Sequence, residues 1–159
     1  MRNFVEISVG IIAAFIFNII LSRLFFSLAL PFNFFSLVVI YFAMARGEIL
    51  GACLGTFCGL IHDTFSLGVF GLSGLSKTIT GFLAGYISRK IDVNPPLRSF
   101  IFISILIFIE LILWIFLYSF VFSERLNIGS GWIFFQPLST AFLGVFLFRF
   151  LRKFKSSKP

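Results

Sequence analysis

Six apolar runs, separated by short polar or charged stretches, occupy most of this chain. Of its 159 residues, 59% are hydrophobic and 12% are charged, and the mean hydropathy is +1.08. A soluble domain of this size has too little interior to hide so much apolar surface. The pattern predicts an all-α, polytopic membrane protein, a six-helix transmembrane bundle in one domain. We expect spans at residues 4–22, 33–45, 47–62, 73–88, 99–122 and 132–149.

Local signals predict where some of these spans begin and end. Asn33 can cap the start of the second span, and Arg46 with Gly47 can end it. Because the third span follows almost at once, the two are expected to form a tight helical hairpin. The segment from Arg89 to Arg98 is expected to be a loop, and Pro137 is expected to interrupt the sixth span.

The basic residues flank these apolar runs, and their distribution predicts the topology. Six spans place both termini on the same side, and short loops rich in Lys and Arg stay in the cytoplasm. Both termini are therefore expected in the cytoplasm, on the side that holds ten of the 13 basic residues, all except Arg23, Lys77 and Arg125. A basic tail over residues 150–159 should contact anionic lipid. The net charge of +7, arranged in this way, does not indicate nucleic-acid binding.

Four glycines at four-residue intervals give the third predicted span one smooth face. They are Gly47, Gly51, Gly55 and Gly59. Helices gain little from the hydrophobic effect in lipid, so close backbone approach over small residues must supply the attraction. We expect this face to pack a partner helix. Packing between the protein's own helices is the alternative. Both kinds of packing can also occur together, at different heights along the helix.

Three charged residues inside the apolar regions are the candidates for a pocket. Asp63 is expected in a loop at the outer end of the third span, with Lys77 about 9 Å below the outer start of the fourth. At similar depth they could pair and contact a ligand. The alternatives are a purely structural ion pair and a lysine that snorkels to the membrane surface. Glu110 is expected alone near the bilayer midplane, about 14 Å from Ile101. It would serve as a proton relay or as a neutral acid that hydrogen-bonds to another helix.

The sequence gives little support for a metal site, a catalytic site or a phosphate-binding site. Cys58 and His62 are one helical turn apart, but with Cys53 they offer three soft ligands at most, and two inert thiols are favoured over a metal site. There is no serine–histidine–acid set and no phosphate-binding loop, so we expect a protein without catalytic activity, cofactor or metal. The first apolar run starts at Phe4 and lacks a small-residue cleavage site, which favours a span over a signal peptide.

The middle of the chain carries a family resemblance. Residues 51–63 read GACLGTFCGLIHD, and after a short glycine-containing loop the next apolar run opens with Gly71-Leu72. This pattern resembles the MreD family of bacterial rod shape-determining membrane proteins, in which a glycine-spaced helix ends in Gly-Leu-x-x-Asp and the next helix opens with Gly-Leu. The resemblance is clearest from Pro31 to Arg89.

The resemblance implies a non-catalytic scaffold of the machinery that builds peptidoglycan during cell elongation and so determines cell shape. The implied partner is an MreC-like protein with a single span. Through it the scaffold would reach MreB filaments, the glycosyltransferase RodA and a class B penicillin-binding transpeptidase. The MreD family is also similar in architecture to the S components of energy-coupling factor transporters. That similarity implies the alternative, a membrane subunit that captures a small vitamin-like molecule, although the first span lacks the Ala-x-x-x-Ala contact of many S components.

Overall fold

The computed structural model describes residues 9–13, 15, 16, 20, 32–65, 70–93, 95–122 and 135–156. These residues form helices and short connections and contain no strand, which confirms the all-α prediction. The helices are α2 (Phe34–Arg46), α3 (Glu48–Phe65), α4 (Leu72–Ser88), α5 (Pro96–Val121) and α6 (Gln136–Ser156). The described residues between 9 and 20 are also helical and fall within the first predicted span.

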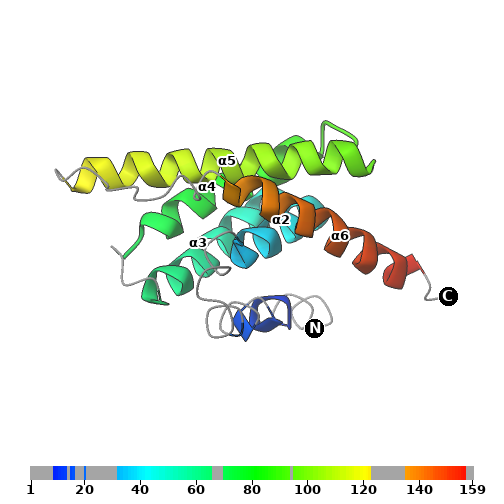
Figure 1. The fold of residues 1–159 in the computed structure, drawn as a ribbon, viewed down its shortest axis with the longest axis horizontal. Coiled ribbons are helices and arrows are strands. Elements are labelled where there is room, and N and C mark those ends of the chain that lie inside the picture. Colours follow the sequence, from blue (N-terminus) through cyan, green and yellow to red (C-terminus); the bar gives the residue numbers. More distant parts are fainter. Residues whose placement is uncertain are drawn as a thin grey trace.

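The helices pack around α2. Figure 1 shows α5 along one side of the molecule, with α2, α3 and α4 beneath it and the N-terminal segment on the side away from α5. The most extensive contact joins α3 to α4, and α2 touches α3, α4 and α6. One apolar core lies among α2, α4, α5 and α6 and includes Leu37, Ile40, Ala43, Ala84, Ile103, Leu106, Ile107, Ala141 and Phe148. A second lies between α2 and α3 and includes Phe34, Phe35, Val39, Phe42, Leu54 and Cys58.

Local signals in the sequence explain where α2 begins and ends. The side chain of Asn33 accepts a hydrogen bond from the backbone N–H of Ser36 at 3.2 Å, which caps the helix as expected. Gly47 ends it with a φ of +101°, a conformation that favours glycine. Because Gly47 alone separates α2 from α3, the two helices form the tight hairpin that was predicted.

Two prolines begin helices where the sequence predicted breaks. The segment from Arg89 to Arg98 was expected to be a loop, but α5 starts at Pro96. Pro137 was expected to interrupt the sixth span, but it is the second residue of α6. Proline suits the first helical turn because its missing N–H has no partner there in any case. Residues 132–134 of the predicted sixth span lie outside the described residues.

The C-terminal helix is also longer than expected. α6 continues to Ser156, so the start of the basic tail predicted at residues 150–159 is helical. Arg152, Lys153 and Lys155 therefore extend a helix whose Ala141 and Phe148 lie in the apolar core.

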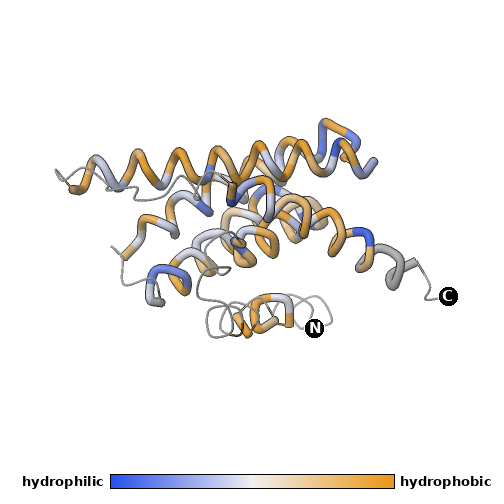
Figure 2. Tube along the Cα trace, viewed as in Figure 1, coloured by the Kyte–Doolittle hydropathy of each residue, from blue (hydrophilic) through white to orange (hydrophobic). Residues whose placement is uncertain are grey.

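One described helix, α5, is long and apolar enough to cross a membrane, with 26 residues and a mean hydropathy of 2.9 in its most apolar window. Only 28% of that window is buried, whereas the core helix of a soluble protein is mostly buried. Its uncovered side chains include Ile101, Ile105, Phe108, Ile112, Phe116 and Phe120. Figure 2 shows hydrophobic residues along almost the whole length of α5. The helix α2 is apolar but shorter.

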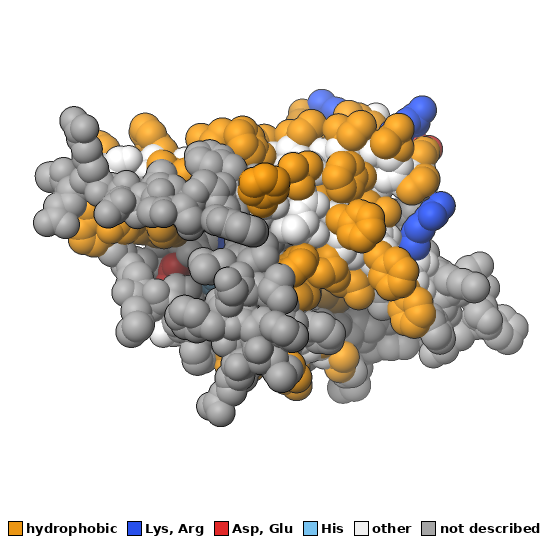
Figure 3. Space-filling view, viewed as in Figure 1, with side chains coloured by type: hydrophobic (Ala, Val, Ile, Leu, Met, Phe, Trp, Pro, Cys, Tyr) orange, Lys and Arg blue, Asp and Glu red, His pale blue; other side chains and the backbone are white. Residues whose placement is uncertain are grey.

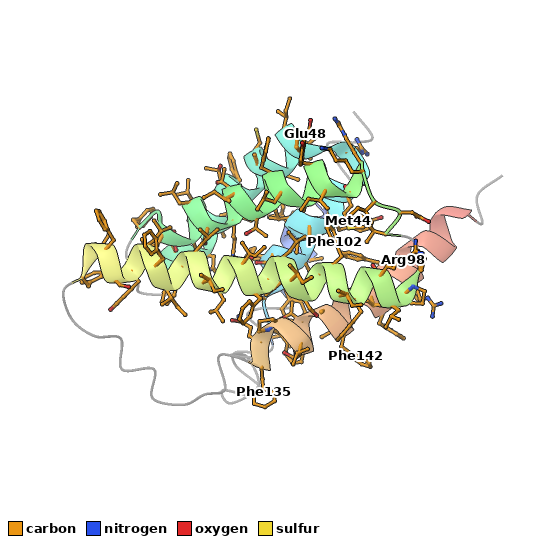
Figure 4. The ribbon with its side chains drawn as sticks, turned by 90° about the horizontal axis from the view of Figure 1, so that it is seen from above. Met44, Glu48, Arg98, Phe102, Phe135 and Phe142 are labelled. Carbon is orange, nitrogen blue, oxygen red and sulfur yellow. The ribbon has the colours of Figure 1, made fainter. Side chains whose placement is uncertain are left out.

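Charged side chains gather at one end of the bundle, where α2 and α4 end and α5 begins. Figure 3 shows Lys and Arg side chains at one end of a mostly hydrophobic face. Figure 4 places Glu48 and Arg98 toward the same end of the molecule. Arg89 donates a hydrogen bond to Glu48 across the α3–α4 contact, with 2.9 Å between Nη1 and Oε1. The apolar surface of the bundle is thus bounded by a charged end.

Candidate functional site

The glycine face of α3 packs against α4 of the same chain. At Gly51, Gly55 and Gly59, an added Cβ would come closer than 3.0 Å to backbone atoms of α4. Real Cβ atoms essentially never approach other atoms so closely, so these three positions admit only glycine at the present helix separation. The facing atoms are the carbonyl oxygen of Gly81 at Gly51, the carbonyl oxygen of Lys77 at Gly55, and the Cα of Gly74 at Gly59.

The expectation that this face packs a partner helix is therefore wrong, and the alternative of internal packing is correct. The fourth glycine, Gly47, lies between α2 and α3. A Cβ there would meet the guanidinium of Arg89, and a Cβ on Gly85 of α4 would lie 2.5 Å from the carbonyl carbon of Gly47. The physical reason is proximity along the chain. The helix that follows α3 after a short connection is the first surface available to its smooth side.

Asp63 lies in the last turn of α3, not in a loop, and it caps the start of α4. Its Oδ2 accepts backbone N–H bonds from Gly71 at 2.9 Å, Ser73 at 3.1 Å and Gly74 at 3.2 Å. The first N–H groups of a helix have no partner within the helix, and the helix dipole favours negative charge there. The predicted pair of Asp63 with Lys77 is wrong because the carboxylate is held at the end of α4 by these donors.

The residues of the family resemblance thus have a common structural role. Gly59 lets the start of α4 approach α3, Asp63 caps that start, and Gly71 adopts a φ of +98° at the helix N-cap. Glycine is the residue best suited to this left-handed conformation. The Gly-Leu-x-x-Asp and Gly-Leu elements together hold α3 and α4 as one hairpin.

Replacing Asp63 with Ala should destabilise the protein by about 2 kcal/mol, the upper end of the range for helix caps, because three backbone donors, two of them buried, lose their acceptor. Asp63→Asn keeps an uncharged acceptor and should lose less. Thermal unfolding of the purified protein in detergent micelles measures the difference. The control is Thr64→Ala, an exposed neighbour whose hydroxyl donates to the backbone of Ile61 within α3. Equal effects of Asp63→Ala and Thr64→Ala would contradict the capping role.

Lys77 forms an ion pair with Glu110, so the prediction of an isolated Glu110 is wrong. The Lys77 ammonium contacts Glu110 Oε1 and also donates to Ser36 Oγ at 3.1 Å. Ser36 donates to the same Oε1 at 2.7 Å, and the amide of Asn33 does so at 3.1 Å. The side chains of Lys77 and Glu110 are 2% and 6% exposed. The pair is therefore inside the bundle, where unpaired charge is very costly.

This polar cluster of Asn33, Ser36, Lys77, Glu110 and Thr140 joins four helices. The backbone N–H of Asn33 donates to Thr140 Oγ1 of α6 at 3.2 Å. The cluster thereby links the start of α2 to α4, α5 and α6. Directional hydrogen bonds of this kind fix the rotation of each helix about its axis, which apolar packing alone specifies less sharply.

Sequence reasoning identified the two charges of the cluster but not its neutral members. Asn33 was expected only as a helix cap, and Ser36 and Thr140 were missed. The signal that could have found them is a short polar side chain on the buried face of an otherwise apolar helix. Ser36 is 1% exposed and Thr140 is fully buried.

The remaining candidate ligands, His62 and the two cysteines, differ in burial. His62 Nδ1 lies 3.3 Å from Ser73 Oγ, and its ring packs edge-on against Phe35. Cys58 is buried and Cys53 is exposed, both as free thiols. Among the residues that the structure describes, no group of three His, Cys, Asp or Glu side chains could hold a metal ion.

No protein-family model, curated protein or solved structure matches this chain.

Proposed function

We propose that this protein is a non-catalytic membrane scaffold of the MreD kind, acting in the cell-elongation machinery of a rod-shaped bacterium. The observation that carries the proposal is the α3–α4 hairpin. The residues that resemble the MreD pattern are spread over two helices and a connection. Three of them, Gly59, Asp63 and Gly71, nevertheless stabilise the same contact, between α3 and the start of α4.

The buried charged side chains are bonded within the chain itself, which supports a structural role and so a scaffold. The Asp63 carboxylate accepts hydrogen bonds from the backbone of α4. The Lys77 ammonium is paired with Glu110 and donates to Ser36. Outside this interior, large apolar side chains are uncovered on every described helix except α2. A bundle with polar groups inside and apolar groups outside suits a lipid environment and contact with other membrane helices.

The finer architecture is part of the proposal: six spans, with both termini in the cytoplasm of a bacterial inner membrane. The charged end of the bundle, where Arg89 and Arg98 lie, would face the cytoplasm, in keeping with the positive-inside rule. Since α4 covers the glycine face of α3, the single span of an MreC-like partner would pack on another face of the bundle.

The orientation can be tested by cysteine labelling in intact cells, in a background that lacks Cys53 and Cys58. We expect Asp92→Cys, at the charged end, to be shielded from an impermeant reagent added outside. Phe70→Cys lies at the opposite end of α4, is 66% exposed in the native residue, and should react. Labelling of Asp92→Cys with protection of Phe70→Cys would invert the proposed orientation.

Depletion of the protein in its own host tests the scaffold. We expect rod-shaped cells to become round, with vitamin uptake unchanged, and an MreC-like protein to co-purify with the full-length chain from native membranes. Normal cell width after complete depletion would contradict the proposal.

One observation favours the second candidate, an S component that binds a small molecule. The buried cluster around Glu110 retains an oxygen without a partner among the described residues. For an S component, depletion would abolish uptake of one vitamin-like compound and leave cell shape intact. About one molecule of that compound would be recovered per molecule of purified protein.

A further inference from the structure

The carboxyl group of Glu110 is bonded through one oxygen only. Its Oε1 accepts hydrogen bonds from Asn33, Ser36 and Lys77, whereas its Oε2 is buried and has no partner in the described part of the chain. Glu110 is 4% exposed, so bulk solvent does not reach this oxygen. Buried polar atoms are almost always hydrogen-bonded, and a carboxylate oxygen without a donor is strongly disfavoured. The buried Oε2 can therefore accept a further hydrogen bond.

The ammonium of Lys77 can donate one hydrogen bond more than the two that the described residues accept from it. An ammonium carries three N–H donors. Two are used, one on Ser36 Oγ at 3.1 Å and one on Glu110 Oε1. Because both carboxyl oxygens are attached to one carbon, the third donor of Lys77 and the open Oε2 belong to groups already in contact. One small group that donates to Oε2 and accepts from Nζ would satisfy both.

We propose that Lys77 and Glu110 form a buried binding site for a single hydroxyl group. A hydroxyl both donates and accepts, as the two open positions require. A cation at the site would meet the ammonium and an anion would meet the carboxylate, so the paired charges favour a neutral ligand. The hydroxyl comes either from a water molecule, the usual partner of otherwise unsatisfied buried groups, or from a larger hydroxyl-bearing molecule. The site exists whether or not the protein is a scaffold.

The test compares wild-type protein with the double variant Lys77→Met/Glu110→Leu. Apolar side chains of similar size replace the ion pair and remove both open positions, and such replacements of buried ion pairs are often tolerated. Infrared spectra of the full-length protein in detergent micelles are recorded in ordinary water and in water enriched in oxygen-18. Small molecules are extracted from both proteins and identified by mass spectrometry. Glu110→Gln is the second variant, because it keeps the shape of the site but exchanges an acceptor for a donor.

A resident water predicts an isotope-sensitive O–H stretching band in the wild type. The band is lost in the double variant and shifted in Glu110→Gln, and no molecule is extracted specifically. A larger ligand predicts one hydroxyl-bearing compound per wild-type protein and none from the double variant, without the water band. If the double variant does not fold, Glu110→Gln alone tests the site. A shifted O–H stretching band in this variant supports a bound water, and failure of this variant to retain the compound supports a larger ligand. Recovery of an ion alone, or of neither water nor compound, would overturn the proposal.

Discussion

Lys77→Met is expected to destabilise the protein by about 3–5 kcal/mol, because it leaves Glu110 buried without its charge partner. Glu110 is also held by Ser36 and Asn33, but both are neutral donors and neither compensates a charge. The measurement is thermal unfolding in detergent micelles, together with the amount of protein that accumulates in the membrane. A loss of several kcal/mol is a large part of the total stability of a domain, so accumulation should fall sharply.

The double variant Lys77→Met/Glu110→Leu is the matched control for this prediction. It removes both charges, so no buried ion remains unpaired, and its stability should be much closer to that of the wild type. Lys90→Met is a second control, since Lys90 is an exposed lysine bonded to Tyr86 near the charged end. If Lys77→Met were no more destabilising than Lys90→Met, the ion pair would not hold the helices together.

Gly55→Ala is expected to destabilise the α3–α4 hairpin by about 3 kcal/mol, the upper end of the range for overpacking. The new methyl group would overlap the carbonyl oxygen of Lys77, and a backbone atom cannot move aside by a change of rotamer. The helices must separate, and the dispersion contacts along their interface weaken together. Thermal unfolding and accumulation in the membrane measure this effect. Gly55→Leu should prevent folding, with any loss of a partner following from that.

Gly74→Ala provides the matched comparison on the facing helix. A Cβ there would meet the nearest atom, in the side chain of Leu60, at 3.5 Å, an ordinary van der Waals distance. Alanine is also the better helix former, by up to about 1 kcal/mol. We therefore expect Gly74→Ala to be neutral or stabilising, and Phe57→Leu, on the exposed side of α3, to have little effect. If Gly55→Ala and Gly74→Ala behaved alike, the close approach at Gly55 would not be a determinant of stability.

Local features of the sequence were sufficient to predict most helices. The predicted spans 33–45, 47–62 and 73–88 end within three residues of α2, α3 and α4. The cap at Asn33 and the break at Gly47 depend on neighbouring residues alone, so a sequence pattern can reveal them. Prolines were the exception, because Pro96 and Pro137 begin helices as readily as they end them.

The sequence by itself determined that the chain is helical and apolar, that Gly51, Gly55 and Gly59 share a face for close contact, and that Lys77 needs a partner. The tertiary structure decided what each of them meets. Asp63 is nearer to Lys77 in sequence than Glu110 is, yet Glu110 forms the pair. The physical reason is that pairing depends on how each helix is rotated and how it crosses its neighbours, and packing of the whole bundle sets these angles. Spacing along one helix shows which residues share a face, but the opposing face belongs to another part of the chain.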